Sequence, residues 1–91
     1  MQVVWTESAR NARVAAIDYI AQDSLTAALS QLDEIERQSD RLAEYPELGR
    51  VGRVKGTREL VINRTSFIAI YRIKGDIIQI FRFLHGAQQW H

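Results

Sequence analysis

Residues 66–84 read SFIAIYRIKGDIIQIFRFL, and this stretch decides the fold. It contains two runs rich in β-branched and aromatic residues, 66–73 and 76–84, which are typical of strands. The Lys-Gly-Asp turn at 74–76 that separates them is typical of a tight reversal between antiparallel strands. We therefore predict a β-hairpin that forms the centre of the second half of the chain.

A third strand is predicted just before the hairpin. The run TRELVI at 57–62 has strand composition, and Asn-Arg-Thr at 63–65 supplies a turn into the next strand. The preceding segment, GRVGRVKG at 49–56, is basic and rich in glycine. Its glycine spacing fits neither a phosphate-binding P-loop nor a dinucleotide-binding fingerprint, so we expect a flexible connection.

The first half of the chain predicts a helical hairpin. A short strand is expected at 2–5 (QVVW), a first helix at 8–23 and a second, amphipathic helix that must bury one face at 25–42. Asp23 and Ser24 break the first helix and cap the second, and Pro46 closes the helical half. The residues at helical spacing are Ala9, Ala12, Ala16, Ile17 and Ile20 in the first helix, and Leu25, Ala28, Leu29, Leu32, Ile35 and Leu42 in the second.

These elements give the order β-α-α-β-β-β, which is an α+β fold class. We expect the helical hairpin to pack on one face of a small, mostly antiparallel sheet and to leave the other face partly open. A chain of 91 residues forms a single domain, here 1–91, with a core of modest size.

Composition excludes several classes of protein. The chain has no cysteine, so it has neither disulfides nor thiolate metal ligands. No apolar run approaches the ~20 residues of a membrane span, and the first ten residues lack the features of a signal peptide. We expect a cytoplasmic protein without a membrane segment.

Charge is divided unevenly along the chain. Residues 1–45 carry four arginines and eight acids, whereas residues 46–91 carry eight Lys/Arg and three acids. One interpretation is simply an acidic helix surface followed by basic strands. The other is a positive face that binds a polyanion or an acidic partner.

The last predicted strand carries the best candidates for chemistry. Strict alternation places Arg82 on one face with Ile78, Ile80 and Leu84, and His85 on the other with Ile77, Gln79, Phe81 and Phe83. Arg82 could hold a phosphate, and His85 could transfer protons near neutral pH. The alternative is that both have only structural roles, and Tyr71 is expected to belong to the core.

Other chemistry is not expected. The two histidines have no carboxylates at metal-ligand spacing, and no nucleophile motif is present. We therefore predict no metal and no cofactor. In the terminal residues AQQWH, Trp90 could stack on a base or fold back over the core.

Several segments together resemble the RelE/ParE superfamily of bacterial toxins from type II toxin–antitoxin systems. They are VVWTESA at 3–9, LAEYPELGRVGRVKGTRELVI at 42–62, SFIAIYRI at 66–73 and IIQIFRFLHGAQQW at 77–90. The resemblance implies a plasmid-stabilising or addiction toxin that inhibits growth. Its expected partner is a cognate antitoxin whose acidic or amphipathic tail covers the toxin in a hetero-oligomer.

Two modes of action are implied by the resemblance. RelE-like members cut mRNA on the ribosome without a metal, and ParE-like members poison DNA gyrase. The nuclease members typically place an arginine in the middle strand and lysines in the strand before it, where this chain has FIAIY at 67–71 and ELVI at 59–62. The ParE-like mode is therefore slightly favoured, with the metal-independent endoribonuclease as the alternative and a non-toxic relative that only binds partners as a further one.

The resemblance also assigns roles to residues. In a nuclease, Arg82 would hold the scissile phosphate and His85 would act as acid or base, with Arg58, Arg64 and Tyr71 as weaker catalytic candidates. In a gyrase poison, the tail would be a recognition edge. The target-binding candidates are Arg82, His85, Gln88, Gln89 and Trp90.

Overall fold

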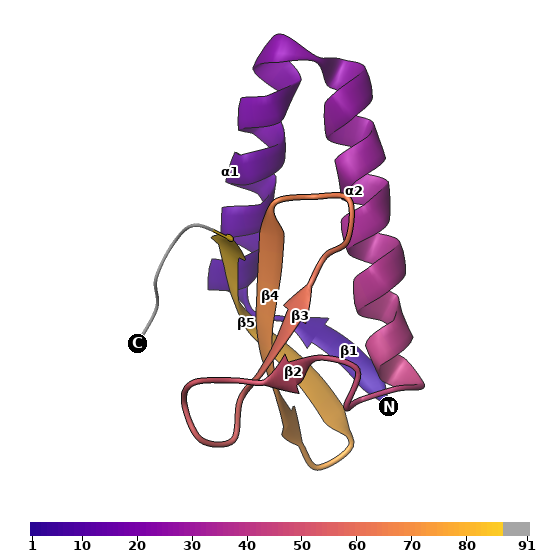
Figure 1. The fold of residues 1–91 in the computed structure, drawn as a ribbon, viewed down its shortest axis with the longest axis vertical. Coiled ribbons are helices and arrows are strands. Elements are labelled where there is room, and N and C mark those ends of the chain that lie inside the picture. Colours follow the sequence, from indigo (N-terminus) through magenta and orange to yellow (C-terminus); the bar gives the residue numbers. More distant parts are fainter. Residues whose placement is uncertain (87–91) are drawn as a thin grey trace.

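The computed structural model describes residues 1–86, in which two helices pack against a five-stranded sheet (Figure 1). The elements are β1 (Gln2–Trp5), α1 (Glu7–Asp23), α2 (Leu25–Asp40), a 3₁₀ turn (Arg41–Ala43), β2 (Arg50–Val51), β3 (Arg58–Val61), β4 (Phe67–Lys74) and β5 (Ile77–His85). The predicted α+β class and order of elements are confirmed, with one strand added.

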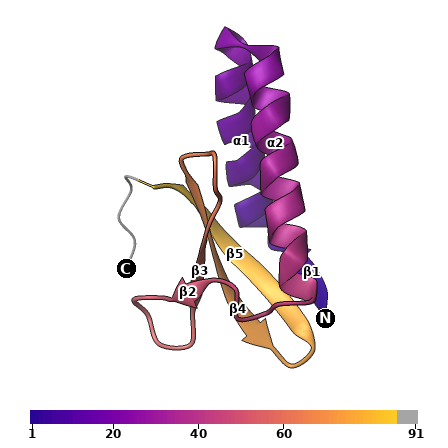
Figure 2. The ribbon, with the colours of Figure 1, turned by 45° about the vertical axis from the view of Figure 1, so that its right-hand side comes forward.

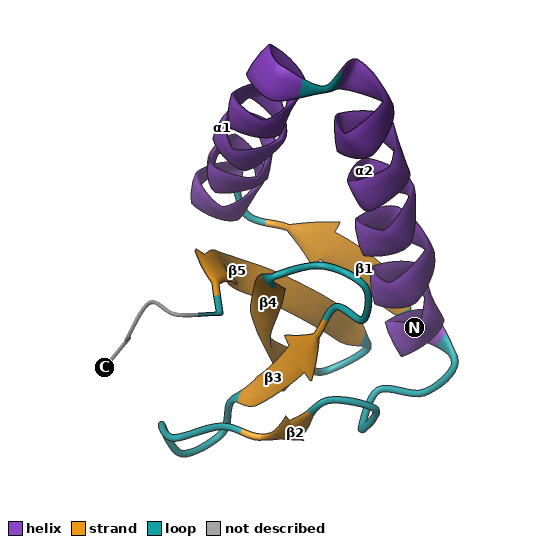
Figure 3. Ribbon diagram, turned by 45° about the horizontal axis from the view of Figure 1, so that its top comes forward, coloured by secondary structure: helices purple, strands orange, loops and turns teal. Residues whose placement is uncertain are grey.

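The sheet has the strand order β1-β5-β4-β3-β2 (Figure 3). β1 runs parallel to β5, and all other neighbours are antiparallel. The sheet is therefore mixed but mostly antiparallel, as predicted. β2 lies in the segment that we expected to be only a flexible connection, and it pairs with Arg58 and Glu59 of β3.

Side-chain caps fix the helical hairpin. The Thr6 hydroxyl accepts a hydrogen bond from the Ala9 amide at the start of α1, and the Ser24 hydroxyl accepts one from the Ala27 amide at the start of α2. The Ser24 amide also donates to the Ile20 carbonyl and so closes the end of α1. One residue thus ends one helix and begins the next, because its backbone is extended between them.

The helices cover one face of the sheet, and the tip of the hairpin extends beyond the sheet (Figures 1 and 2). The main core lies between these layers. Its fully buried members include Ile35 of α2, Tyr71 of β4 and both Ile78 and Ile80 of β5. This core combines residues from both halves of the chain.

The stripe in α1 lies against the core, because Ala9 is buried and the other four members, Ala12, Ala16, Ile17 and Ile20, are half-buried and pack against it. The overhang corrects the predicted stripe of α2, in which Leu25 and Leu29 are 64% and 57% exposed. The prediction that α2 buries one face along its whole length is therefore wrong for its first turns, which lie beyond the sheet. α2 also ends at Asp40, and buried Leu42 belongs to the 3₁₀ turn.

Candidate functional site

A β-bulge in β5 determines which way the candidate residues face. Ile80 pairs with Tyr71 but Arg82 pairs with the next residue of β4, Ile70, so Phe81 is an extra residue in β5. Phe83 consequently joins Ile80 in the core under the helices. The prediction of strict alternation, which put Arg82 on the face of Ile80, is wrong.

Arg82 and His85 lie on opposite faces of the sheet. Arg82 pairs with Ile70, which belongs to the small cluster on the open face, away from the helices. His85 pairs with Phe67 and packs edge-on against its ring, 6.0 Å between centroids, on the helix side. The structure therefore does not bring the two main catalytic candidates together around one substrate, and their catalytic role remains a prediction.

Tyr71 and Arg58 hold a loop segment against the sheet. The fully buried Tyr71 hydroxyl donates to the Pro46 carbonyl (2.7 Å) and accepts from the Gly49 amide (2.9 Å). Arg58 Nη1 donates to the Gly49 carbonyl at 2.9 Å. Burial raises the pKa of Tyr71 above its ordinary value, partly offset by the Gly49 hydrogen bond, so the phenol stays protonated at neutral pH.

Arg64 lies in the β3–β4 turn, and its backbone has a positive φ of 68°. Its guanidinium lies 3.3 Å from the carboxylate of Glu34 in α2. Gln38 clamps the same turn, because its amide bonds both the carbonyl (2.9 Å) and the amide (2.8 Å) of Asn63. Hydrogen bonds from Gln38 and then Arg37 lower the pKa of Glu34. The three weaker catalytic candidates thus have structural contacts at two separate sites.

The remaining target-binding candidates, Gln88, Gln89 and Trp90, lie outside the described residues.

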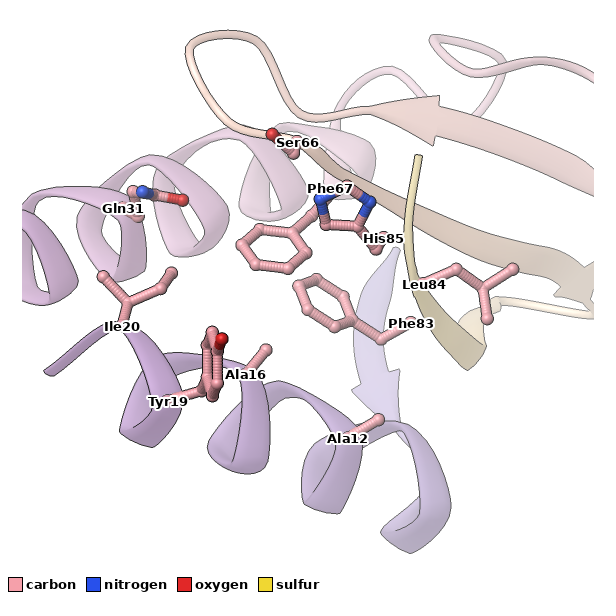
Figure 4. Close-up of a pocket in the computed structure, with 10 residues that line it drawn as sticks. All are labelled: Ala12, Ala16, Tyr19, Ile20, Gln31, Ser66, Phe67, Phe83, Leu84 and His85. Carbon is pink, nitrogen blue, oxygen red and sulfur yellow. The ribbon is translucent and has the colours of Figure 1, made fainter. Parts of the chain in front are cut away.

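An apolar groove opens where the helical hairpin overhangs the end of the sheet (Figure 4). Its volume is ≈ 520 Å³. The stacked rings of Phe67 and Phe83, 5.0 Å apart, form its floor, and Tyr19 stands at its rim with 74% of its surface exposed. The lining residues are Ala12, Ala16, Tyr19, Ile20, Gln31, Ser66, Phe67, Phe83, Leu84 and His85. A groove of small and aromatic side chains suits the apolar face of a helix.

The open face of the sheet has two parts. Toward the end of β5, Val61, Ile68 and Leu84 follow one another across β3, β4 and β5 in a row of aliphatic side chains. Nearer the β4–β5 turn, Arg72 and Arg82 line a hollow beside the 54–57 loop. The first part offers no charge for chemistry, and the second concentrates cations.

The described residues contain neither a metal-binding cluster nor a membrane-spanning helix. Within residues 1–86, no three His, Asp or Glu side chains lie close enough to hold a metal ion together. Neither helix in this part of the chain has the length and apolar character needed to cross a membrane.

Comparison with known families gives a direct match. Residues 3–90 match the model described as "ParE toxin of type II toxin-antitoxin system, parDE". The chain belongs to the ParE toxin family. It is thus a toxin of a type II toxin–antitoxin system, in the RelE/ParE superfamily that the sequence motifs indicated.

Individual relatives agree with this assignment to the ParE family. The chain is 44% identical to "Putative toxin Y4kP" of Sinorhizobium fredii over 79% of this chain and 74% of the relative. It is 37% identical to "Toxin RelE2" of Caulobacter vibrioides over 96% and 97% of the two chains. Among solved structures, the "Chromosomal ParDE TA system from P. aeruginosa" matches with a TM-score of 0.84 and 32% identity, over 93% of this chain and 95% of that one.

Sequence reasoning missed two surfaces of this ParE-family protein. Ala12 and Ala16 are recognisable in the sequence only as residues at helical spacing, whereas in the structure they are half-buried and line the groove. Phe81 and Arg72 were not singled out as a pair, although Arg72 lies 4.0 Å over the Phe81 ring. The sequence feature that indicates the groove is the small size of Ala12 and Ala16, because small side chains leave space between α1 and the sheet.

Proposed function

We propose that this ParE-family toxin arrests growth by poisoning DNA gyrase while a cognate antitoxin is absent. The observation that carries this proposal is the aliphatic row Val61, Ile68 and Leu84 on the open face. A nuclease of this fold needs cations there to stabilise phosphate charge in the transition state. The position of Arg82 and His85 on opposite faces of the sheet supports the same interpretation.

A second candidate function is ribosome-dependent mRNA cleavage, which the match to a relative named Toxin RelE2 favours. One experiment separates the two. The full-length toxin is added to purified gyrase with supercoiled DNA and, in parallel, to ribosomes translating a defined message. Gyrase-linked DNA breaks without mRNA cleavage support the proposal, and mRNA cleavage without DNA breaks contradicts it.

A growth assay tests the third alternative, a non-toxic relative that only binds partners. Induction of the toxin alone should stop DNA synthesis before protein synthesis and trigger a DNA-damage response. If induction leaves growth unchanged, the chain is a non-toxic relative that retains only partner binding.

The proposed partner is an antitoxin whose amphipathic tail lays its apolar face in the groove between α1 and the sheet. The solved relative is described as a ParDE toxin–antitoxin system, which supports a partner of this kind. The groove offers Ala12, Ala16 and Ile20 along one side of α1 and two stacked phenylalanine rings opposite. Acidic residues of the tail would complement the basic second half of the toxin.

A matched pair of substitutions tests this antitoxin site. Ala16→Glu places a carboxylate in the groove, whereas Ala15→Glu places one on the exposed side of α1. Because burying an unpaired charge is costly, Ala16→Glu should weaken antitoxin binding by roughly 100-fold or more, measured by titration calorimetry. Equal affinities for the two variants would exclude the groove as the binding site.

A further inference from the structure

The turn between β3 and β4 is fastened to α2 by side chains of that helix (Figure 1). Gln38 is only 6% exposed, and its side-chain amide donates to the Asn63 carbonyl at 2.9 Å and accepts from the Asn63 amide at 2.8 Å. A residue of a paired antiparallel strand makes the same two kinds of bond. The Gln38 amide also donates to the Glu34 carboxylate at 3.0 Å. Glu34, Gln38 and Asn63 together form the clamp.

An ion pair joins the same two segments. The Glu34 carboxylate, 13% exposed, contacts Arg37 of its own helix and Arg64 of the turn. Arg64 has a positive φ of 68°, which is costly for a residue other than glycine. The turn therefore adopts a conformation that its own sequence does not favour, and the contacts to α2 help to offset that cost.

The clamp connects the two walls of the apolar groove. Gln31, Glu34 and Gln38 recur at helical spacing and so share one face of α2, and Gln31 lines the groove. On the other wall, Ser66 and Phe67 line the groove and follow the clamped turn directly in the chain (Figure 4). The distance between these walls thus depends on how the turn is held against α2.

Hydrogen bonds within the turn tie Phe67 to the clamp. The Thr65 hydroxyl donates to the Ile62 carbonyl at 2.8 Å and accepts from the Phe67 amide at 3.1 Å. The Ile62 amide in turn donates to the Phe67 carbonyl at 3.0 Å. On the far side, the Ser66 carbonyl accepts from the Gly86 amide at 2.5 Å. A displacement of the turn would therefore also displace the Phe67 ring at the floor of the groove.

We propose that Gln38, supported by Glu34, is a positioning residue for antitoxin binding. The clamp holds the wall of the groove where an amphipathic helix can enter. Gln38 is buried and does not line the groove, so it acts through the turn and Phe67. This inference rests on the proposed function in one respect, the placement of the antitoxin tail in the groove, and it adds the residues that keep that site in its binding shape.

Loss of the clamp should affect association more than dissociation. When the turn is free to leave α2, only a fraction of the toxin molecules has the binding shape, and the apparent Kd rises by the inverse of that fraction. In the complex, the antitoxin holds the turn itself and makes the same contacts, so dissociation changes little. Loss of a residue that touches the antitoxin directly would instead raise the dissociation rate.

The test is surface plasmon resonance of the full-length toxin on the immobilised antitoxin that is encoded with it. Gln38→Leu removes both bonds to Asn63. Ser39→Ala is the matched control, because it removes a buried hydrogen bond to the Ile35 carbonyl within α2 and leaves the turn untouched. Gln38→Leu should slow association about 10-fold, as for a binding shape present in about one molecule in ten, and Ser39→Ala should change neither rate.

A second measurement reports on the groove without the antitoxin. Incorporated fluorophenylalanine labels the three phenylalanines of the chain, Phe67, Phe81 and Phe83. The fluorine resonance of Phe67 is assigned by its absence in Phe67→Leu. Gln38→Leu should shift or broaden this resonance, because the ring loses its fixed position, and Ser39→Ala should leave it unchanged.

Slower association and a changed Phe67 resonance in Gln38→Leu alone support the inference. Unchanged association, equal losses in Gln38→Leu and Ser39→Ala, faster dissociation alone, or an unchanged Phe67 resonance overturns it. If Ala16→Glu blocks binding but Gln38→Leu binds normally, the antitoxin site stands and this inference fails. If Ala16→Glu binds as tightly as Ala15→Glu, the proposed antitoxin site fails and its positioning by Gln38 fails with it.

A control for folding keeps the test decisive. Circular dichroism checks that Gln38→Leu is folded. If it is not, Glu34→Ala repeats both measurements, because it releases Gln38 and Arg64 without leaving a backbone group of Asn63 unpaired. A smaller change in the same direction is then expected, and the absence of any change overturns the inference.

Discussion

The helix-covered face and the open face of the sheet are built from the same strands but from different kinds of side chain. Under the helices, Ile78, Ile80 and Tyr71 are fully buried in one continuous core. On the open face, Ile70 is buried but its neighbours Arg72 and Arg82 are exposed. One face thus supplies most of the stability, while the other presents charged side chains to solvent.

The largest expected effect tests the stabilising face. Ile80→Ala should lower the free energy of unfolding by about 3–4 kcal/mol, because it leaves a cavity in the main core. Ile68→Ala, on the half-buried open face, should cost about 1 kcal/mol. Urea unfolding measures both, and similar losses would show that the two faces contribute equally.

A smaller loss of stability is expected when the buried hydroxyl of Tyr71, on the helix-covered face, is removed. Tyr71→Phe removes both hydrogen bonds of the buried hydroxyl and leaves the Gly49 amide and the Pro46 carbonyl without that partner. The expected loss is about 2 kcal/mol. The exposed Tyr19→Phe should change little, and a comparable loss there would mean that burial does not distinguish the two tyrosines.

The same tyrosine predicts how stability depends on pH. An unfolded tyrosine ionises near 10.0, whereas burial raises the pKa of Tyr71 in the folded protein. Its contribution is therefore fully present below about pH 10 and is lost as the pH rises through the folded-state value. Thermal melts from pH 8 to 11 should show a shallower alkaline decline for Tyr71→Phe than for the unchanged protein, and identical declines would contradict this.

The smallest effect on stability belongs to the open face. Arg82→Gln should change the free energy of unfolding by no more than about 0.5 kcal/mol, as is usual for exposed positions. The same substitution should weaken gyrase poisoning. A large loss of stability would contradict the conclusion that the open face contributes little to the free energy of unfolding.

Local sequence signals predicted much of this fold. The cap at Ser24, the turns at 63–65 and 74–76, and runs of β-branched residues indicated the helices and the strands β3, β4 and β5. β2 was missed because two residues in a glycine-rich segment carry no periodic pattern. β2 is a strand only because its two residues pair with Arg58 and Glu59 of β3.

The candidate site was less predictable. Alternation along β5 assumed a regular strand, and the sequence IQIFRFL contains no glycine or proline that would indicate a bulge at Phe81. One extra residue in β5 reverses the face of the sheet to which each later side chain of the strand points. Strict alternation therefore predicted the wrong face for Arg82. The gathering of Lys55, Arg72 and Arg82 likewise depends on strand register and loop folding, which are tertiary properties.

The parallel pairing of β1 with β5 has a consequence for how the protein is made. Trp5 pairs with Ile80, which lies 75 residues later in the chain, and β5 also forms the inner strand between β1 and β4. Domains begin to fold from the N-terminus during synthesis, but contacts across such long separations form late and slowly. The nascent chain can form its helical hairpin early, but β1 has no neighbouring strand until residues 77–85 have been made and have folded as β5. The main core, which contains Ile78 and Ile80, therefore closes only after β5 has joined the sheet.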